Sequence, residues 1–324
     1  MNHSATATRH PRVEVPTLLV AAAIYGGFGL VTWHFHDWPR VLTLPLATIL
    51  IAWHGSLQHE TIHGHPFRSR RLNTLLGGVP LSLWIPYAIY RRSHLYHHRF
   101  DGRILTDPWQ DPESYYLKPG ALARSSAPVR ALRMANTTLL GRMLVGPAIS
   151  VGTFLAGEAR ALAAGDRRAW RIWLWHALAC IPLLGWVIGI CHISLLAYLA
   201  CFVYPGTSLS LLRSFAEHRA NADLAERTAV VEANPLISTI FLYNNYHVVH
   251  HTWPGLPWYA IGSVWRQMKS RGEDAAVRRA GLFYPGGYVE IARCYLLSPV
   301  IRTEYPLAPP ATASGEMLAA PATR

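Results

Sequence analysis

The chain alternates between long stretches without charge and short stretches rich in arginine. Residues 15–36 and 41–59 contain no Asp, Glu, Lys or Arg, and residues 172–212 form an uncharged run of 41 positions. A helix needs about 20 apolar residues to cross a bilayer, so the first two runs can each span once and the third can span twice. The pattern predicts an all-α integral membrane protein with four transmembrane helices in two hairpins, at about 15–36, 41–59, 172–190 and 192–212.

Two further stretches are apolar but less suited to crossing. Residues 72–90 are interrupted by two glycines and two prolines, and residues 143–157 form an uncharged run of only 15. Both are predicted to be interfacial segments that lie in the membrane surface. Within the long third run, Gly185 and Gly189 are predicted to mark the turn between the third and fourth spans.

Composition agrees with a membrane protein. Only 15% of the 324 residues are charged, whereas a soluble domain averages about 25%. The net charge of +12 could indicate a nucleic-acid partner, but the basic residues lie between apolar segments, as in FRSRR at 67–71. The positive-inside rule accounts for them and places both termini and all long loops in the cytoplasm. The four cysteines form no CxxC pair, which disfavours a thiolate metal site.

Three histidine-rich motifs follow the apolar runs. LQHETIHGH (57–65) closes the second run, RRSHLYHHRF (91–100) follows the 72–90 segment, and NNYHVVHH (244–251) comes after the fourth span. An HxxxH pair is expected about once by chance in a chain of this composition, but two HxxHH triplets only about once in a thousand chains. The two triplets therefore carry the inference. The eight histidines are His59, His63, His94, His97, His98, His247, His250 and His251.

The spacing predicts that each motif presents its histidines on one side of a helix. Residues i, i+3 and i+4 fall within an arc of about 100°. The third motif lies on the same side of the membrane as the first two if the 172–212 hairpin supplies both intervening crossings. Eight imidazoles exceed the needs of one metal, since zinc sites take about four ligands. Nitrogen ligation with open positions suits iron and oxygen chemistry, so we expect two iron ions with about four imidazoles each.

The HETIH motif also fits the HExxH pattern of zinc proteases, an interpretation that leaves six histidines unexplained. The three motifs in order, HETIH, HLYHH and HVVHH, resemble the membrane fatty acid desaturase/hydroxylase superfamily over residues 40–260. HHTWPGLPWY (250–259) and SFAEHR (214–219) are similar to its bacterial branch, which also contains hydrocarbon oxygenases and carotenoid ketolases. One departure is that the first motif has three intervening residues, where many acyl-CoA desaturases have four.

The resemblance implies four spanning helices under a cytosolic helical cap that holds the histidine motifs and a di-iron centre, with the acyl chain in an apolar tunnel. It also implies a ninth ligand, His218, which occupies the position of a family histidine after the fourth span. The expected location is a bacterial inner membrane. O₂ would be the co-substrate, and electrons would come from a separate ferredoxin- or cytochrome-type carrier, since the sequence shows no dinucleotide fingerprint and no cysteine cluster.

Several polar residues near the motifs are candidates for holding the ligating rings by their second nitrogen, as outer-shell groups commonly do. His54 and His65 flank the first motif; both are candidate metal ligands, but an outer-shell role or contact with solvent is expected of them. The other candidates are Glu60, Asp107, Asp111, Glu217, Asn244 and Asn245.

The sequence thus predicts a membrane domain over residues 15–305, with a cytosolic tail at 1–14 and a disordered Pro- and Ala-rich tail at 306–324. The first functional hypothesis is O₂-dependent desaturation of a lipid-linked acyl chain. The second is a hydroxylase or ketolase of the same superfamily acting on a hydrocarbon, a carotenoid or another small molecule. The third is a membrane protein that binds metal without catalysis, which the scarcity of polar residues within the spans disfavours as a transporter.

Overall fold

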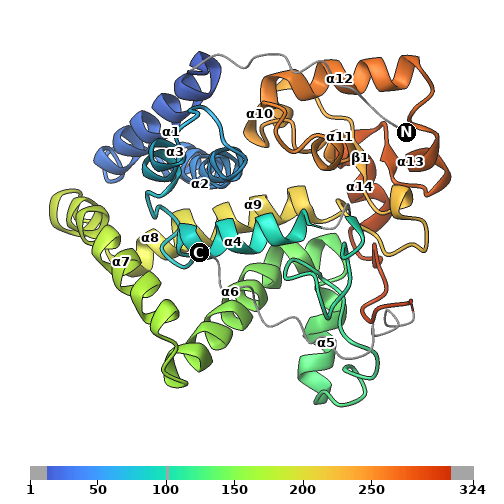
Figure 1. Ribbon diagram of the computed structural model, residues 1–324. Coiled ribbons are helices and arrows are strands. Elements are labelled where there is room, and N and C mark those ends of the chain that lie inside the picture. Colours follow the sequence, from blue (N-terminus) through green and yellow to red (C-terminus); the bar gives the residue numbers. More distant parts are fainter. Residues whose placement is uncertain (1–12, 100–101, 308–324) are drawn as a thin grey trace.

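The computed structural model describes residues 13–99 and 102–307, and these are mostly helical (Figure 1). The helices of the first half are α1 (Val15–Trp33), α2 (Arg40–Ile62), α3 (Arg70–Gly77), α4 (Tyr87–His97), α5 (Ala127–Ala135), α6 (Leu139–Ala163) and α7 (Arg167–Leu184). The chain continues through π-helix η2 (Gly185–Ile190), α8 (Leu195–Tyr198), π-helix η3 (Leu199–Val203), α9 (Tyr204–Ser214) and 3₁₀-helix η4 (Leu224–Glu226).

Short elements make up the C-terminal part, which lies at the upper right of Figure 1. These are β1 (Val230–Val231), α10 (Pro235–Ile240), α11 (His247–Thr252), α12 (Trp258–Ser270), α13 (Ala275–Arg279), β2 (Phe283–Tyr284) and α14 (Gly287–Tyr295). The two strands pair in parallel, with Val230 opposite Phe283. The predicted tail at 306–324 lies outside the described residues except for 306 and 307. Most of the predicted N-terminal tail does too, but Glu14 donates its backbone N–H to the Pro66 carbonyl at 3.1 Å.

Five helical segments are long and apolar enough to cross a membrane: Val15–Trp33, Arg40–Ile62, Leu139–Ala163, Arg167–Ile190 and Leu195–Ser214. Four of them match the predicted spans. The fifth, α6, contains the 143–157 segment, which is therefore part of a much longer helix than its uncharged run indicated. Arg142 at one end and Glu158 and Arg160 at the other are simply included in the helix. A total of four spans stays a prediction.

The turn inside the third uncharged run is not where the glycines indicated. Helix α7 continues past Gly185 and Gly189 as the π-helix η2, and the chain turns at Cys191–Ser194, where His192 adopts a positive φ of 53°. The shape of the third and fourth spans is otherwise as predicted. The 72–90 segment forms the eight-residue helix α3, a loop and the start of α4, which is too short to cross.

Two apolar cores fix the positions of the histidine motifs. One lies between α1, α2 and the η2–α9 segment and includes Ile24, Leu57 and Phe202, all fully buried. The other joins β1, α11, α12 and α14 and includes Val249 and Ile291, also fully buried. Leu57 precedes His59 by two residues and Val249 lies between His247 and His250, so the first motif is anchored to one core and the third to the other.

Candidate metal centre

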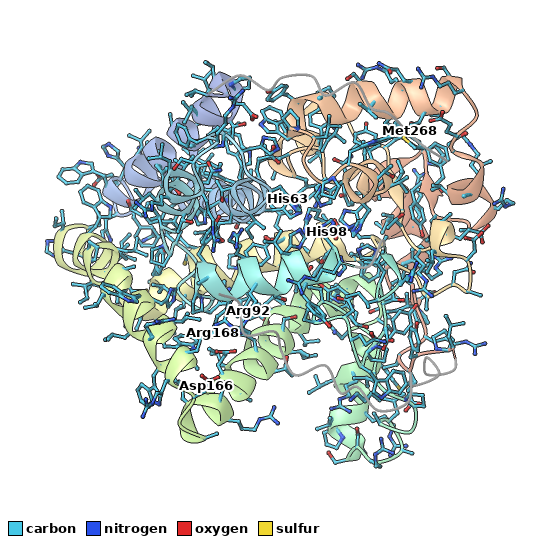
Figure 2. The ribbon with its side chains drawn as sticks, viewed as in Figure 1. His63, Arg92, His98, Asp166, Arg168 and Met268 are labelled. Atoms are coloured by element: carbon cyan, nitrogen blue, oxygen red, sulfur yellow. The ribbon has the colours of Figure 1, made fainter. Side chains whose placement is uncertain are left out.

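Four parts of the chain bring their histidines to one place. Helix α2 ends at the first motif, α4 ends within the second, His218 follows α9, and α11 is formed by the third motif. Because α2 packs against both α1 and α9, the ends of these helices are held together. Figure 2 shows His63 and His98 near the middle of the molecule, between the α1–α2 pair and the C-terminal helices.

All nine histidines singled out from the sequence fall into two groups. Within each group, one ring nitrogen of every member lies within 4.8 Å of the others. The five-histidine group consists of His59, His63, His94, His98 and His250. The four-histidine group consists of His97, His218, His247 and His251.

The division follows one rule in every motif. Residues i and i+4 join the same group, as His59 and His63 do, and residue i+3 of a triplet joins the other. On a helix i and i+4 are about 40° apart, whereas i+3 lies about 60° from i on the opposite side. A triplet placed between two metal positions thus directs its rings to both. The second motif contributes two rings to the five-histidine group and one to the four-histidine group, and the third motif does the reverse.

The ring nitrogens that face one another lie close together, but they carry too few protons for every pair to form a hydrogen bond. In the four-histidine group, Nε2 of His218 lies 3.2 Å from Nε2 of His97 and 3.0 Å from that of His247. His97 Nδ1 lies 2.8 Å from the Asp111 carboxylate and His218 Nδ1 lies 3.4 Å from the Arg227 carbonyl. Both partners only accept, so each Nδ1 carries the proton and each Nε2 presents a lone pair.

A metal ion satisfies such a set of lone pairs. One extra proton could bridge a single pair of rings, whereas a cation at the centre accepts all four. Nitrogens bonded to one metal at about 2.1 Å and at right angles lie roughly 3 Å apart. The Nε2 separations in the five-histidine group are of this size, at 2.9 Å for His63 and His94 and 3.0 Å for His98 and His250. His59 Nε2, fully buried, has no hydrogen-bond partner among the described residues, which fits a metal ligand.

Burial also holds the rings in the form that binds metal. It lowers the pKa of His250 and His251 well below the ordinary value, and neighbouring imidazoles lower it further. His97 is the exception: burial acts to lower its pKa, but the carboxylates of Glu113 and Asp111 outweigh burial and raise it. Neutral imidazole is the ligand form, so the eight rings other than His97 are prepared for a cation rather than a proton, and His97 would release a proton when metal binds.

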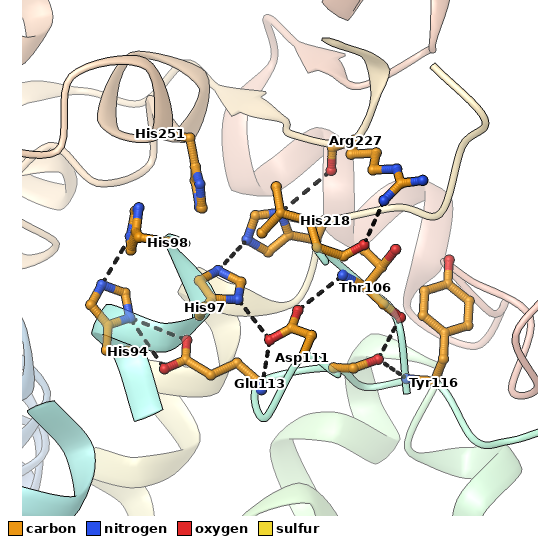
Figure 3. Close-up of polar contacts among 12 residues, drawn as sticks. His94, His97, His98, Thr106, Asp111, Glu113, Tyr116, His218, Arg227 and His251 are labelled. Atoms are coloured by element: carbon orange, nitrogen blue, oxygen red, sulfur yellow. Dashed lines mark hydrogen bonds and ion pairs between the residues drawn. The ribbon is translucent and has the colours of Figure 1, made fainter. Parts of the chain in front are cut away.

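Two carboxylates hold the rings of His94 and His97 from behind (Figure 3). Asp111 binds His97 as described and accepts the backbone N–H groups of Thr106 and Glu113, each at 2.9 Å. Glu113 places both oxygens 3.2 Å from His94 Nδ1. Sequence reasoning missed Glu113; its acidic loop DPWQDPE (107–113), following the second motif, was the available signal.

His247 has two outer partners that the sequence had singled out. Asn244 Oδ1 lies 3.0 Å from its Nδ1, and Glu217 Oε1 lies 3.6 Å away. Glu217 is itself paired with Arg213 at 3.1 Å. These contacts connect the end of α9 to α11.

The other predicted outer residues make different contacts. Asp107 accepts hydrogen bonds from Trp109 N and the Gln110 side chain, so it shapes the loop that carries Asp111. Asn245 donates to the Val231 carbonyl and to Ser238, which ties β1 to α10. Both side chains thus organise the surroundings rather than a ligating ring.

Glu60, His65 and Glu14 form a separate buried cluster beside the two groups. His65 Nδ1 lies 2.7 Å from Glu14, and Glu60 accepts the backbone N–H of Trp258 at 2.9 Å. The cluster joins the start of α1, the end of α2 and the start of α12. His54 lies one turn before the first motif, with its ring against Tyr25, and belongs to neither histidine group.

A cavity of about 640 Å³ opens beside the four-histidine group. His97, His218 and His247 form part of its wall, together with His94 from the other group. Most of its remaining lining comes from α2, the α3–α4 loop, α4, the 112–117 loop, α6 and α9. It combines apolar side chains such as Trp84 and Phe154 with several hydroxyl groups and with charged groups of both signs, Glu113 and Arg213 among them.

Comparison with known proteins places this geometry in a family. Residues 36–281, which include all nine histidines, match the fatty acid desaturase family. The chain belongs to the fatty acid desaturase family. The resemblance inferred from HETIH, HLYHH and HVVHH is thereby confirmed.

Similar curated proteins include two relatives from Haematococcus lacustris, beta-carotene 4-ketolase 3 and beta-carotene ketolase. Each is 25% identical over 225 residues, or 66% of this chain, and the matched region spans only 58% of the length of either relative. The chain thus has several apolar helices, the sequence of the fatty acid desaturase family and two histidine groups that are suited to iron.

Proposed function

We propose that the protein is a di-iron membrane desaturase that uses O₂ to introduce a double bond into a lipid-linked acyl chain. The observation that carries this proposal is the convergence of nine imidazoles in two adjacent groups, whose inward-facing nitrogens present lone pairs. The five-histidine group would hold one iron ion and the four-histidine group the other. Bound iron would supply O₂ activation and abstraction of hydrogen from an unactivated C–H bond.

The residues of the chain orient this site and shield it. Asp111 and Glu113 fix the rings of His97 and His94 by their Nδ1 protons, and their negative charge offsets the cost of two buried cations. His94, His97, His218 and His247 line the cavity, so a substrate there would lie against both groups. Apolar side chains such as Trp84 and Phe154 would exclude water from an acyl chain.

The grouping of the histidines supports an even number of crossings between the second and third motifs. His98 and His250 have Nε2 atoms 3.0 Å apart, so residues 98 and 250 lie on the same side of the membrane. Three of the five apolar helices, α6, α7 and the α8–α9 segment, lie between them. At most two can cross completely, and α6, with Arg142, Glu158 and Arg160 in its sequence, is the best candidate for an interfacial helix.

The proposed orientation follows from the arginines. FRSRR at 67–71 and the arginines that start α7 belong to the side that carries the histidines, which the positive-inside rule places in the cytoplasm of a bacterial inner membrane. A separate ferredoxin- or cytochrome-type protein would deliver electrons to this face.

A second candidate function is oxygen insertion, as in a hydroxylase or ketolase. Two observations favour it: both relatives reported above are carotenoid ketolases, and hydroxyl groups such as those of Ser93, Ser114 and Ser214 line the cavity near the histidines. Polar walls tolerate an oxygenated product better than an apolar tunnel does.

Product analysis separates the two. Wild-type protein and a His250→Ala variant would be expressed in a bacterial host that makes saturated membrane lipids, with a second culture supplied with β-carotene. A wild-type-dependent loss of two hydrogens from acyl chains supports desaturation. Gain of oxygen on lipid or carotenoid supports the second candidate. An iron-loaded protein that consumes no O₂ and changes neither substrate would overturn both and leave a non-catalytic metal-binding protein.

A further inference from the structure

A buried arginine forms part of the cavity wall without an anionic partner. Arg142, near the start of α6, is only 1% exposed and lines the same cavity as His97 and His218. The chain makes room for its stem with a glycine, since a Cβ at Gly146 would lie 2.9 Å from Arg142 Cδ. The guanidinium is therefore held in the interior rather than reaching out to solvent.

The contacts of Arg142 leave part of its hydrogen-bonding capacity unused. Nε donates to the Asn136 carbonyl at 2.9 Å, and the guanidinium carbon lies 3.9 Å from the centre of the Tyr115 ring. Nη1 has no hydrogen-bond partner within the described ranges 13–99 and 102–307. In the same ranges, the ion pairs of the protein include none that involves Arg142.

Two other arginines, half-buried Arg213 and buried Arg227, have partners. Arg213 is paired with Glu217 at 3.1 Å. Arg227 donates to three backbone carbonyls, those of Asn221, Arg103 and Leu105. A buried cation without an anion or a full set of acceptors is costly. Arg142 is left without such partners at the cavity wall, where an anionic ligand can supply them.

A second unpartnered atom lies close by. Asn136 Oδ1 is buried without a hydrogen-bond partner in the described part of the chain, and Asn136 also lines the cavity. The backbone carbonyl of Asn136 accepts the hydrogen bond from Arg142 Nε, so these two residues are neighbours in the cavity wall. Rotation of the Asn136 amide by half a turn would present its N–H groups in place of this oxygen, beside the unpartnered Nη1 of Arg142.

We infer that Arg142 binds the ionised head group of the substrate, a carboxylate at the end of an apolar chain. The inference rests on the proposed di-iron chemistry and assigns to it a free amphipathic acid in place of a lipid-linked acyl chain. A guanidinium matches a carboxylate with two parallel hydrogen bonds and stays charged at every physiological pH. Ile149 and Phe154 follow Arg142 on α6 and line the same cavity, so they offer apolar wall for the chain. A hydrocarbon without an acidic group would leave Arg142 unpaired.

Binding of three ligands that share a ten-carbon alkyl or acyl chain tests the role of Arg142 without enzymatic turnover. Isothermal titration of the full-length, iron-loaded protein would compare decanoate, methyl decanoate and decyl phosphate at pH 8. We expect wild-type protein to bind decanoate at least about tenfold more tightly than the ester, since a charge-assisted pair is lost in the ester. Arg142→Gln should abolish this preference and leave the affinity for the ester unchanged. Arg142→Lys, which keeps a charge but not the planar fork, should retain part of it.

Arg160→Gln is the matched control, because Arg160 is on the same helix, carries the same charge and is exposed. It should behave as wild type. Equal binding of decanoate and ester by wild-type protein would overturn the inference, and so would an unchanged preference in Arg142→Gln. Tighter Arg142-dependent binding of decyl phosphate than of decanoate would support the anion site and assign it to a phosphate monoester head group.

The outcome is separable from that of the proposed function. An Arg142-dependent acid preference in a protein that never oxidises its ligand would uphold the anion site while the proposed function fails. A protein that desaturates acyl chains but binds acid and ester equally would uphold the proposed function while the role of Arg142 fails. If Arg142→Gln does not fold, the comparison of the three ligands in wild-type protein still decides.

Discussion

The two histidine groups differ in how firmly the protein holds them. In the four-histidine group, His97, His218 and His247 each have an acceptor on Nδ1, namely Asp111, the Arg227 carbonyl and Asn244. In the five-histidine group, among the described residues, only His94 has one, Glu113. The side chain of Asp111 is 1% exposed, whereas that of Glu113 is 30% exposed.

This difference shows two ways to build a nitrogen-rich site. The four-histidine group has fewer ligands, but three of its four rings have fixed tautomers and one has a buried counter-charge, so these three are oriented before a metal arrives. The five-histidine group has one more ligand but freer rings, which are positioned by contact with one another. We therefore expect the four-histidine group to bind its metal more tightly and the five-histidine group to tolerate the loss of a ring better.

Removal of one ring from each group should give the largest contrast. His218→Ala leaves three imidazoles in its group, and we expect O₂-dependent product formation to fall by more than about 100-fold, since even outer-shell losses can reach that size. His63→Ala leaves four imidazoles and should retain measurable activity. Initial rates on membrane preparations, normalised to protein amount, would measure both. Equal loss in the two variants would remove the asymmetry between the groups.

The buried carboxylate should matter next. Asp111→Asn keeps the shape of the side chain but removes the charge behind His97, and metal affinity should fall by about 10- to 100-fold. Competition with a chromogenic chelator would measure it. Asp107→Asn is the matched control from the same loop, where its partners are Trp109 and Gln110. An equal effect of both variants would mean that loop structure, not the charge on His97, explains the loss.

A smaller effect is expected at the exposed carboxylate. Glu113→Gln removes the acceptor of His94 Nδ1, but solvent screens this charge and four further rings surround the same position. We expect the affinity of the five-histidine group to fall by no more than about threefold in the same chelator assay. A loss as large as that from Asp111→Asn would show that exposure does not set the strength of these contacts.

The smallest effect on metal should come from the histidine beside both groups. His65→Leu leaves the two groups intact but removes the hydrogen-bond donor to Oε1 of buried Glu14, 2.7 Å away. The free energy of unfolding should drop by about 1–3 kcal/mol, the cost of a buried acceptor left without its donor. Metal content should stay that of wild type. A loss of metal in this variant would make His65 a ligand.

Much of the site could be predicted because the spacing of the histidines along each helix determines where their rings point. The i, i+3, i+4 triplets identified the histidines, and their offsets of about 40° and 60° on a helix also determine the division into two groups. Glu113 and the isolation of Asp107 could not be predicted, because they depend on how an irregular loop folds back onto α4. Glu60 was misleading for a similar reason: it neighbours His59 in sequence but its carboxylate turns to Trp258 N.

The fold could also be predicted in part from the sequence. Uncharged runs located α1, α2 and the α7–α9 region, since burial in lipid requires continuous apolar sequence. They failed for α6, where Arg142 and Arg160 lie inside a 25-residue helix. An arginine that lines a cavity or reaches solvent does not end a helix, so the length of an uncharged run underestimates the helix that contains it.

Metal content shows whether the nine histidines hold two iron ions. Full-length protein purified in detergent would be assayed for iron and zinc by plasma mass spectrometry, with His218→Ala beside it. Two converging sets of imidazoles predict about two irons per wild-type chain and about one in the variant. Wild-type protein that contains no iron, or zinc in an amount that His218→Ala leaves unchanged, would contradict the account.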